Sequence, residues 1–68
     1  MVISVYVNGA KTDISQNTSL SALLNQLEIA GEKVAVERNL EIVPKSLYAE
    51  TILTDGDRLE VVHFIGGG

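Results

Sequence analysis

A turn, a strand and a run of glycines follow one another in the C-terminal stretch DGDRLEVVHFIGGG (55–68). Asp-Gly-Asp (55–57) is a strong turn signal, because aspartate side chains hydrogen-bond to nearby backbone and glycine accepts positive φ. The next segment, RLEVVHFI (58–65), is rich in β-branched and aromatic residues, which are typical of strands. The stretch therefore predicts a strand that runs directly into a flexible glycine tail, 66–68.

Strand periodicity recurs elsewhere in the chain. Residues 2–7 (VISVYV) alternate as a strand, the following Asn8-Gly9 favours a tight hairpin turn, and 10–14 (AKTDI) form the return strand. Strand character resumes in VAVER, 34–38, and Asn39 marks the turn after it.

One segment has helical periodicity instead. Four leucines recur at the spacing of a single helix face: Leu20, Leu23, Leu24 and Leu27. Thr18 or Ser19 is expected to cap the start of this helix, and Gly31 suits its end. A helix of about ten residues is marginal alone in water, so we expect its leucine face to cover a sheet.

The order of elements predicts a single α+β domain, 1–68. One helix packs across one face of a mixed sheet of four or five strands. The first and last strands are the most hydrophobic, so we expect them side by side in the centre. Before the last strand, Pro44 stops the short apolar step Ile42-Val43 and is expected to begin one helical turn.

Composition excludes several classes of function. The 68 residues include no cysteine, so neither a disulfide nor a Cys-ligated metal site can form. Five Lys and Arg against nine Asp and Glu give a net charge of −4, which argues against binding nucleic acid or an anionic membrane. Aromatic residues are scarce, so an aliphatic core is predicted. Neither a membrane span nor a signal peptide is apparent, and a cytoplasmic location is expected.

Internal side chains offer little catalytic chemistry. His63 is the sole histidine and has no partner at metal-ligand spacing, so we interpret it as a strand residue partly packed at the sheet margin. Asp55, Asp57 and Glu60 lie close together in the sequence, but Asp55-Gly56-Asp57 is interpreted as a turn and the three carboxylates not as a cation site. The polar run 37–39 is either a partner contact or a solvated strand end, and the solvated end is favoured.

The terminal glycines have no evident role in the fold. They are either a frayed end or a device for presenting the α-carboxylate of Gly68. A carboxylate can attack the α-phosphate of ATP to give an acyl-adenylate, whose carbonyl carbon is electrophilic. A segment without side chains can enter the narrow channel of a partner enzyme. A chain with this tail and no catalytic constellation is expected to be a carrier or substrate, not an enzyme.

The chain resembles the ubiquitin-like β-grasp group and, within it, the ThiS family of thiamine biosynthesis sulfur carriers. The resemblance covers the whole chain and is most specific in VERN (36–39), Ile42-Val43-Pro44 and 55–68. It implies that an activating enzyme, related to ubiquitin-activating enzymes, adenylates Gly68 with ATP and magnesium. A donor such as a cysteine desulfurase then supplies sulfur, and thiazole synthase receives it from the thiocarboxylate. Since ATP and magnesium belong to the activating enzyme, no cofactor is expected on this chain.

The resemblance also assigns the other tail glycines. Gly67 corresponds to the second residue of the family's glycine pair, and Gly66 is an added spacer, since many members have a non-glycine residue there. Both are expected to contribute to recognition of the tail.

A docking surface is predicted beside the tail. Strand alternation puts Val62 and Phe64 on the face opposite to Leu59 and Val61. Together with Ile65 they would form an exposed apolar patch for a partner enzyme, unless the Phe64 ring folds onto the sheet edge.

Three other functions share these features. The first is the small subunit of molybdopterin synthase, which uses the same thiocarboxylate. The second is a ubiquitin-like modifier, whose adenylate is attacked by an amine. The third is a plain binding domain whose tail has no function.

Overall fold

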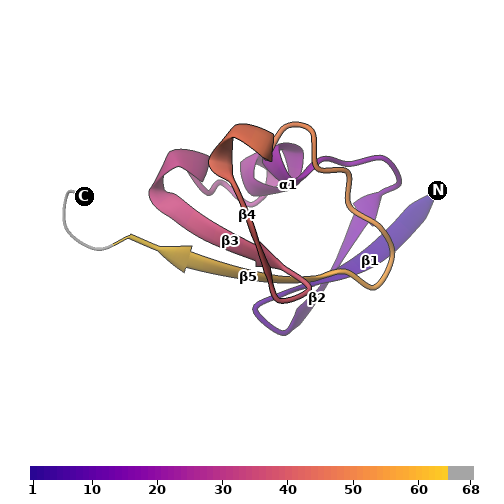
Figure 1. Ribbon diagram of the computed structural model, residues 1–68. Coiled ribbons are helices and arrows are strands. Elements are labelled where there is room, and N and C mark those ends of the chain that lie inside the picture. Colours follow the sequence, from indigo (N-terminus) through magenta and orange to yellow (C-terminus); the bar gives the residue numbers. More distant parts are fainter. Residues whose placement is uncertain (65–68) are drawn as a thin grey trace.

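The computed structural model describes residues 1–64. Within them the chain forms a five-stranded mixed sheet in the order β2-β1-β5-β3-β4 (Figure 1). The strands are β1 (Val2–Val7), β2 (Ala10–Ser15), β3 (Val34–Arg38), β4 (Glu41–Val43) and β5 (Arg58–His63). β5 lies parallel to β1 and antiparallel to β3. The predicted mixed sheet with its first and last strands adjacent is therefore confirmed.

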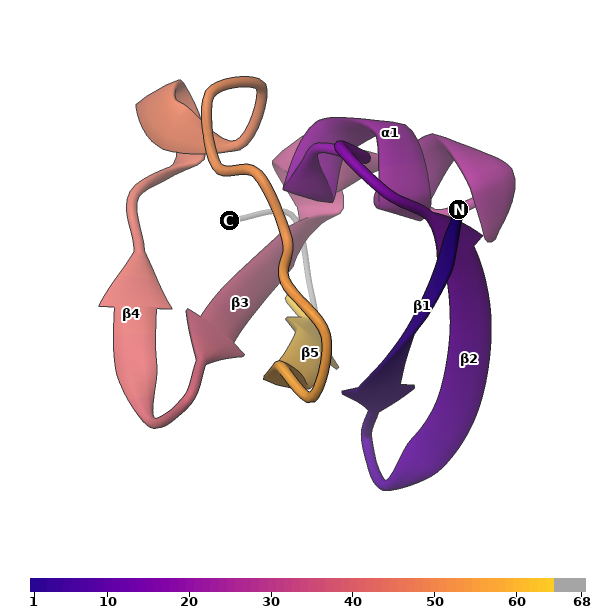
Figure 2. The same ribbon diagram turned by 90° about the vertical axis from the view of Figure 1, so that its right-hand side faces the viewer.

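A single α-helix in the described part of the chain, α1 (Leu20–Gln26), lies across one face of this sheet (Figure 2). Ser19 caps it as expected, since its hydroxyl accepts the backbone N–H of Ala22 at 3.0 Å. None of the helices among residues 1–64 is long and apolar enough to cross a bilayer.

The end of α1 differs from the prediction. The helix stops before Leu27, and Glu28 adopts a left-handed φ of 60°. The N–H of Glu28 then bonds to the carbonyl of Asn25, and that of Ile29 to Leu24, which is the Schellman pattern of helix termination. Gly31 therefore does not end this helix, and it begins the 3₁₀ turn η1 (Gly31–Lys33) instead.

Two hairpins flank β5, and each has a two-residue turn with positive φ at both positions. Asn8 and Gly9 form the β1–β2 turn, with φ of 50° and 86°. Asn39 and Leu40 form the β3–β4 turn, with φ of 51° and 73°. This is the geometry of type I′ turns. Leu40 is unusual in it, because a branched side chain in the left-handed region meets its own backbone, and Leu40 is 89% exposed.

The pairing of β1 with β5 is extended by a side chain. Register partners join these strands at only two positions within the described residues. Beyond them, the Asn8 amide Nδ2 donates to the carbonyl of Val61 at 3.1 Å, and the Val61 N–H donates to Asn8 Oδ1 at 2.7 Å. The Asn8 amide thus substitutes for a further backbone partner along β5.

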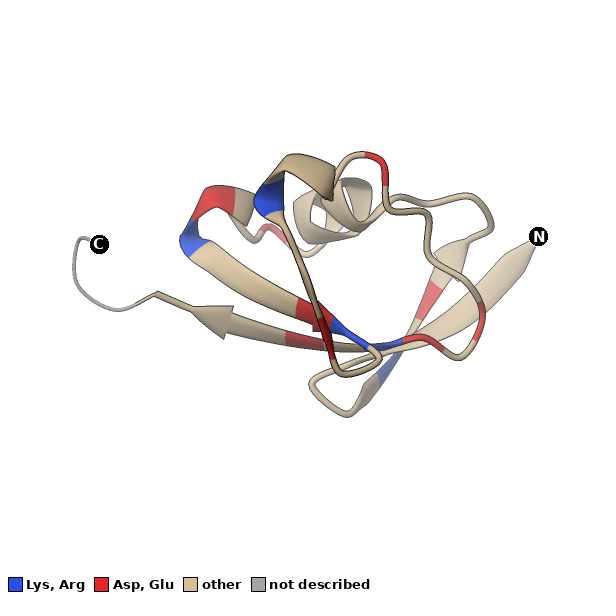
Figure 3. Cartoon of the chain, in the orientation of Figure 1, with Lys and Arg blue, Asp and Glu red and all other residues tan. Residues whose placement is uncertain are grey.

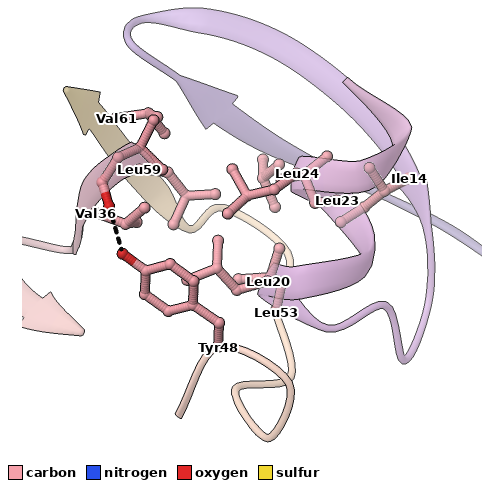
Figure 4. Packing of buried hydrophobic residues seen from close by; sticks show 11 residues of the cluster. Ile14, Leu20, Leu23, Leu24, Val36, Tyr48, Leu53, Leu59 and Val61 are labelled. Atoms are coloured by element: carbon pink, nitrogen blue, oxygen red, sulfur yellow. Dashed lines mark hydrogen bonds between the residues drawn. The ribbon is translucent and has the colours of Figure 1, made fainter. Parts of the chain in front are cut away.

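The core lies between α1 and the sheet (Figure 4). Its buried residues are Val5, Ile14, Leu20, Leu23, Leu24, Val34, Val36, Tyr48, Leu53, Leu59 and Val61. The expectation of a wholly aliphatic core is wrong at Tyr48, whose hydroxyl donates to the carbonyl of Val34 at 3.1 Å. Burial raises the pKa of the Tyr48 phenol, so it remains a donor. The 3₁₀ turn that places it, η2 (Lys45–Leu47), follows Pro44 as predicted.

Candidate functional site

Hydrogen bonds of the β3–β5 pair and of η1 hold the chain as far as Phe64, the last residue that the structure describes. His63 is the register partner of Val34 at the end of β5. One residue later, the N–H of Phe64 donates to the carbonyl of Lys33 at 2.9 Å. Four residues of the predicted site lie outside the described part of the chain: Ile65, Gly66, Gly67 and Gly68.

Burial alternates along the end of β5. Leu59 and Val61 are buried in the core, whereas Val62 is 60% exposed. Phe64, just past the strand, is 52% exposed. The predicted exposure of these two apolar residues is therefore present, and their docking role stays a prediction. His63 is exposed at the end of β5, so any packing at the sheet margin leaves much of its side chain in solvent.

The Phe64 ring has a cation above it. Lys45 Nζ lies 4.2 Å from the ring centroid, which is within the range of a cation–π contact. Lys45 reaches this position from η2, where it also donates to the carbonyl of Glu32 at 2.8 Å. Phe64 is thus half exposed and partly covered by Lys45.

An apolar groove of about 230 Å³ lies on β3, β4 and β5, beside Val62. Ala35 is the register partner of Val62, and the exposed side chains of Leu40 and Ile42 also line the groove. The groove extends the predicted docking patch across the sheet, away from the tail.

Two carboxylates face each other within this groove. Glu37 on β3 and Glu60 on β5 are register partners, and Figure 3 shows acidic residues of both strands near the middle of the sheet. Like charges directly opposite one another destabilise an antiparallel pair. The surface thus combines apolar side chains with negative charge, which suits a neutral or basic partner surface.

Asp57 is the buried centre of a polar network. Its carboxylate accepts the backbone N–H of Thr54 at 2.8 Å, Nδ2 of Asn39 at 3.0 Å and Nε of Arg38 at 2.9 Å. Burial alone would raise the pKa of Asp57, but these donors outweigh it and hold the pKa below its ordinary value. Gly56 adopts a φ of 86°, so the predicted turn is confirmed.

The network adds a structural role to the polar run 37–39. Arg38 and Asn39 both bind Asp57 through their side chains, and Asn39 is at the same time exposed, as a solvated strand end would be. Glu37 lies on the open face of the sheet. Within residues 1–64, no group of three His, Cys, Asp or Glu side chains is arranged to hold a metal ion.

Comparison with known proteins gives the family. The family model described as the ThiS family matches residues 2–68. This chain belongs to the ThiS family. The sulfur carrier protein ThiS of Bacillus subtilis is 40% identical to it over 63 residues, which cover 91% of this chain and 96% of that protein.

The fold of this ThiS-family chain also matches a solved structure. The crystal structure of the thiamine biosynthesis protein ThiS from Geobacter metallireducens matches with a TM-score of 0.83 and 32% identity. The match covers 97% of this chain and all of that one, 100%. The expected family and the ubiquitin-like β-grasp fold are therefore confirmed.

Another relative of this ThiS-family chain is much longer. A thiazole synthase of Paramagnetospirillum magneticum is 52% identical over 66 residues, which cover 97% of this chain but 20% of that protein. The chain thus spans about a fifth of the length of this thiazole synthase, which contains a ThiS-like stretch.

Sequence reasoning missed part of the candidate surface. Ala35 and Ile42 could have been found by strand alternation on β3 and β4. Leu40 could not, because a leucine at the second position of a type I′ turn runs against the usual preference for glycine. Nothing in the sequence indicated that Lys45 would lie over the Phe64 ring.

Proposed function

We propose that this chain carries sulfur, as a thiocarboxylate on Gly68, for formation of the thiazole ring of thiamine. The observation that supports this most is membership of the ThiS family, because the family match extends through the terminal glycine. The Bacillus relative is named as a sulfur carrier, and a thiazole synthase contains a similar stretch.

The proposed chemistry occurs in two steps, and both involve the carboxyl group of Gly68. A carboxylate oxygen of Gly68 attacks the α-phosphorus of ATP, and pyrophosphate leaves. A sulfur nucleophile then attacks the carbonyl carbon, a C–S bond forms, and AMP departs with the electrons of the C–O bond. If the donor is a persulfide, two electrons from a thiol cleave its S–S bond and free the thiocarboxylate.

The chain is the substrate of these steps and its partners are the catalysts. The proposed partners are a ubiquitin-activating-like adenylating enzyme, a sulfur donor such as a cysteine desulfurase, and thiazole synthase. ATP and magnesium would bind to the adenylating enzyme, so this chain needs no cofactor of its own. The proposed setting is the cytoplasm, where ATP is available.

The partner enzymes are proposed to dock on the face that presents Val62 and Phe64, with Ile65 beside them. The apolar groove next to Val62 would widen this contact. Because β5 is bonded to a strand on each side, a partner that binds this face would meet the end of β5 in a fixed position.

The absence of cysteine provides a direct test. The protein would be produced together with its activating enzyme and sulfur donor, treated with a thiol-alkylating reagent, and its intact mass measured. Since no side chain offers a thiol, we expect a single adduct, and we expect deletion of Gly68 to abolish it. No adduct, with an activating enzyme that works on another carrier, would contradict the proposal.

Two further results separate the related functions. A strain that lacks this protein should fail to grow only when thiamine is withheld, whereas loss of a molybdopterin synthase subunit would leave thiamine synthesis intact. A ladder of larger conjugates in cell extracts would instead indicate a protein modifier.

A further inference from the structure

Phe64 is held by two neighbours at the last point where the structure describes the chain. Its N–H donates to the carbonyl of Lys33 at 2.9 Å, and its ring lies under Lys45 Nζ at 4.2 Å. The first contact fixes the backbone of Phe64, and the second fixes the ring. Together they hold both the backbone and the side chain of Phe64.

Lys45 is itself held in place. Its ammonium donates to the carbonyl of Glu32 at 2.8 Å. Successive carbonyls of η1, from Glu32 and Lys33, thus bind the Lys45 ammonium and the Phe64 N–H. We call the contacts among Lys33, Lys45, Glu32 and Phe64 the tail clasp.

The fold does not depend on the Lys45 side chain. Lys45 is exposed and Phe64 is half exposed, and neither belongs to the core. The nearby η2 turn is attached to the sheet by the buried Tyr48 and its hydrogen bond to Val34. A cation–π contact on the surface adds little to folding, but it restricts an aromatic side chain and the backbone that bears it.

We propose that Lys45 is a positioning residue, which orients the C-terminal segment through Phe64 for presentation of Gly68 to the adenylating enzyme. This inference rests on the proposed function. Four residues follow Phe64, and four residues span at most about 14 Å. With so short a reach, the direction of the chain at Phe64 decides whether the carboxylate meets the ATP site.

The clasp is proposed to act by raising the fraction of molecules in which the chain after Phe64 has the direction that the adenylating enzyme requires. When only a fraction of carrier molecules has the correct tail direction, apparent affinity falls by that fraction, while turnover of the bound complex is unchanged. Loss of an exposed cation–π contact and one hydrogen bond corresponds to a change of about three- to ten-fold in such a population.

The test compares three variants by adenylation kinetics with the activating enzyme. Lys45→Met keeps the alkyl chain but removes the cation, so we expect KM for the carrier to rise about three- to ten-fold, with kcat unchanged. Lys45→Arg restores a cation and donors and should recover the wild-type KM. Lys11→Met changes the net charge equally at an exposed position of β2, away from the clasp, so it should behave as wild type.

A second measurement uses the free protein. In Lys45→Met, the NMR resonances of the Phe64 ring should shift and the Phe64 amide should become more mobile, with the urea midpoint unchanged. Unmoved ring resonances, or a KM equal to that of Lys11→Met, would overturn the clasp. Unfolding of Lys45→Met would also overturn it, because the contact would then be part of the fold.

The same kinetic measurements distinguish failure of the proposed function from failure of the positioning role. If the wild-type protein is not adenylated at all, the function fails and the positioning role fails with it. If the wild-type protein is adenylated and Lys45→Met matches it, only the positioning role fails.

Discussion

Replacing Asp57 with asparagine tests whether the buried polar network ties the start of β5 to the β3–β4 hairpin. The substitution keeps the shape of the side chain but removes its charge. It also puts an NH₂ group among donors, because Arg38, Asn39 and Thr54 all donate to this carboxylate. At least one of those donors must then lose its acceptor.

The expected loss follows from the contacts. A hydrogen bond to a charged group contributes about 1.5–3 kcal/mol, and an unpaired buried partner adds its desolvation cost. The Arg38 side chain is 29% exposed, so water compensates part of its lost ion pair with Asp57. We expect Asp57→Asn to lower the free energy of unfolding by about 2–4 kcal/mol. That is a large part of the roughly 3–10 kcal/mol typical of a chain of this size.

The matched control is Asp55→Asn, two residues earlier in the same turn. Asp55 is exposed and its Oδ1 accepts one N–H, that of Ser4 at 2.9 Å. An asparagine oxygen can accept the same bond, so we expect a loss of about 0.5 kcal/mol or less. Urea unfolding followed by circular dichroism measures both variants under the same conditions.

The pH dependence of Asp57→Asn provides a second check. The folded-state pKa of Asp57 lies below its ordinary value of 3.8. A group of this kind stabilises the fold at pH values above its unfolded pKa, and that contribution is lost as pH falls through the folded pKa. The difference in the free energy of unfolding between wild type and Asp57→Asn should therefore be largest at neutral pH and shrink below about pH 4. A difference that grew in acid, or a loss no larger than that of Asp55→Asn, would refute the reasoning.

Three other substitutions give simpler outcomes. Asn8→Gly keeps the positive φ but removes both amide bonds to Val61; it should cost about 1–3 kcal/mol and speed hydrogen exchange at the Val61 N–H. Gly31→Ala should stabilise by about 0.4–1 kcal/mol in urea unfolding, because the new Cβ meets Tyr48 at an ordinary 3.6 Å; destabilisation would mean that glycine is needed there. Leu40→Gly relieves a left-handed φ and should stabilise the fold by about 0.5–1 kcal/mol in urea unfolding. It should also weaken binding to the activating enzyme, because Leu40 lines the apolar groove. Unchanged stability would argue against strain at Leu40.

Local patterns were enough to predict most of the fold. The leucine spacing and the Ser19 cap predicted the start of α1, since both depend on neighbouring residues. Its end was missed because glycine is the usual left-handed residue after a helix, and here Glu28 takes that conformation. Tyr48 was missed as a core residue because its buried hydroxyl depends on a carbonyl supplied by β3.

The site was predicted less completely, for a related reason. Alternation along one strand was enough to place Val62 on the open face. The roles of Arg38 and Lys45 depend on contacts between distant segments: Arg38 meets a residue 19 positions away, and Lys45 meets the Phe64 ring. Such contacts follow from strand order and register, which residue periodicity does not specify.

Because β5 is the central strand, the sheet is complete only when the segment that precedes the tail has been inserted. Each hairpin pairs residues close in sequence, whereas Asn8 and Val61 are 53 positions apart. Closing so long a loop costs entropy before its contacts form, so we expect insertion of β5 to come late in folding. Until β5 is inserted, Leu59 and Val61 are missing from the core, and Phe64 is not bonded to Lys33. Under the proposed function, a partner that binds the sheet and the tail together would therefore accept only fully folded molecules, so the strand order would act as a quality check before sulfur is transferred to Gly68.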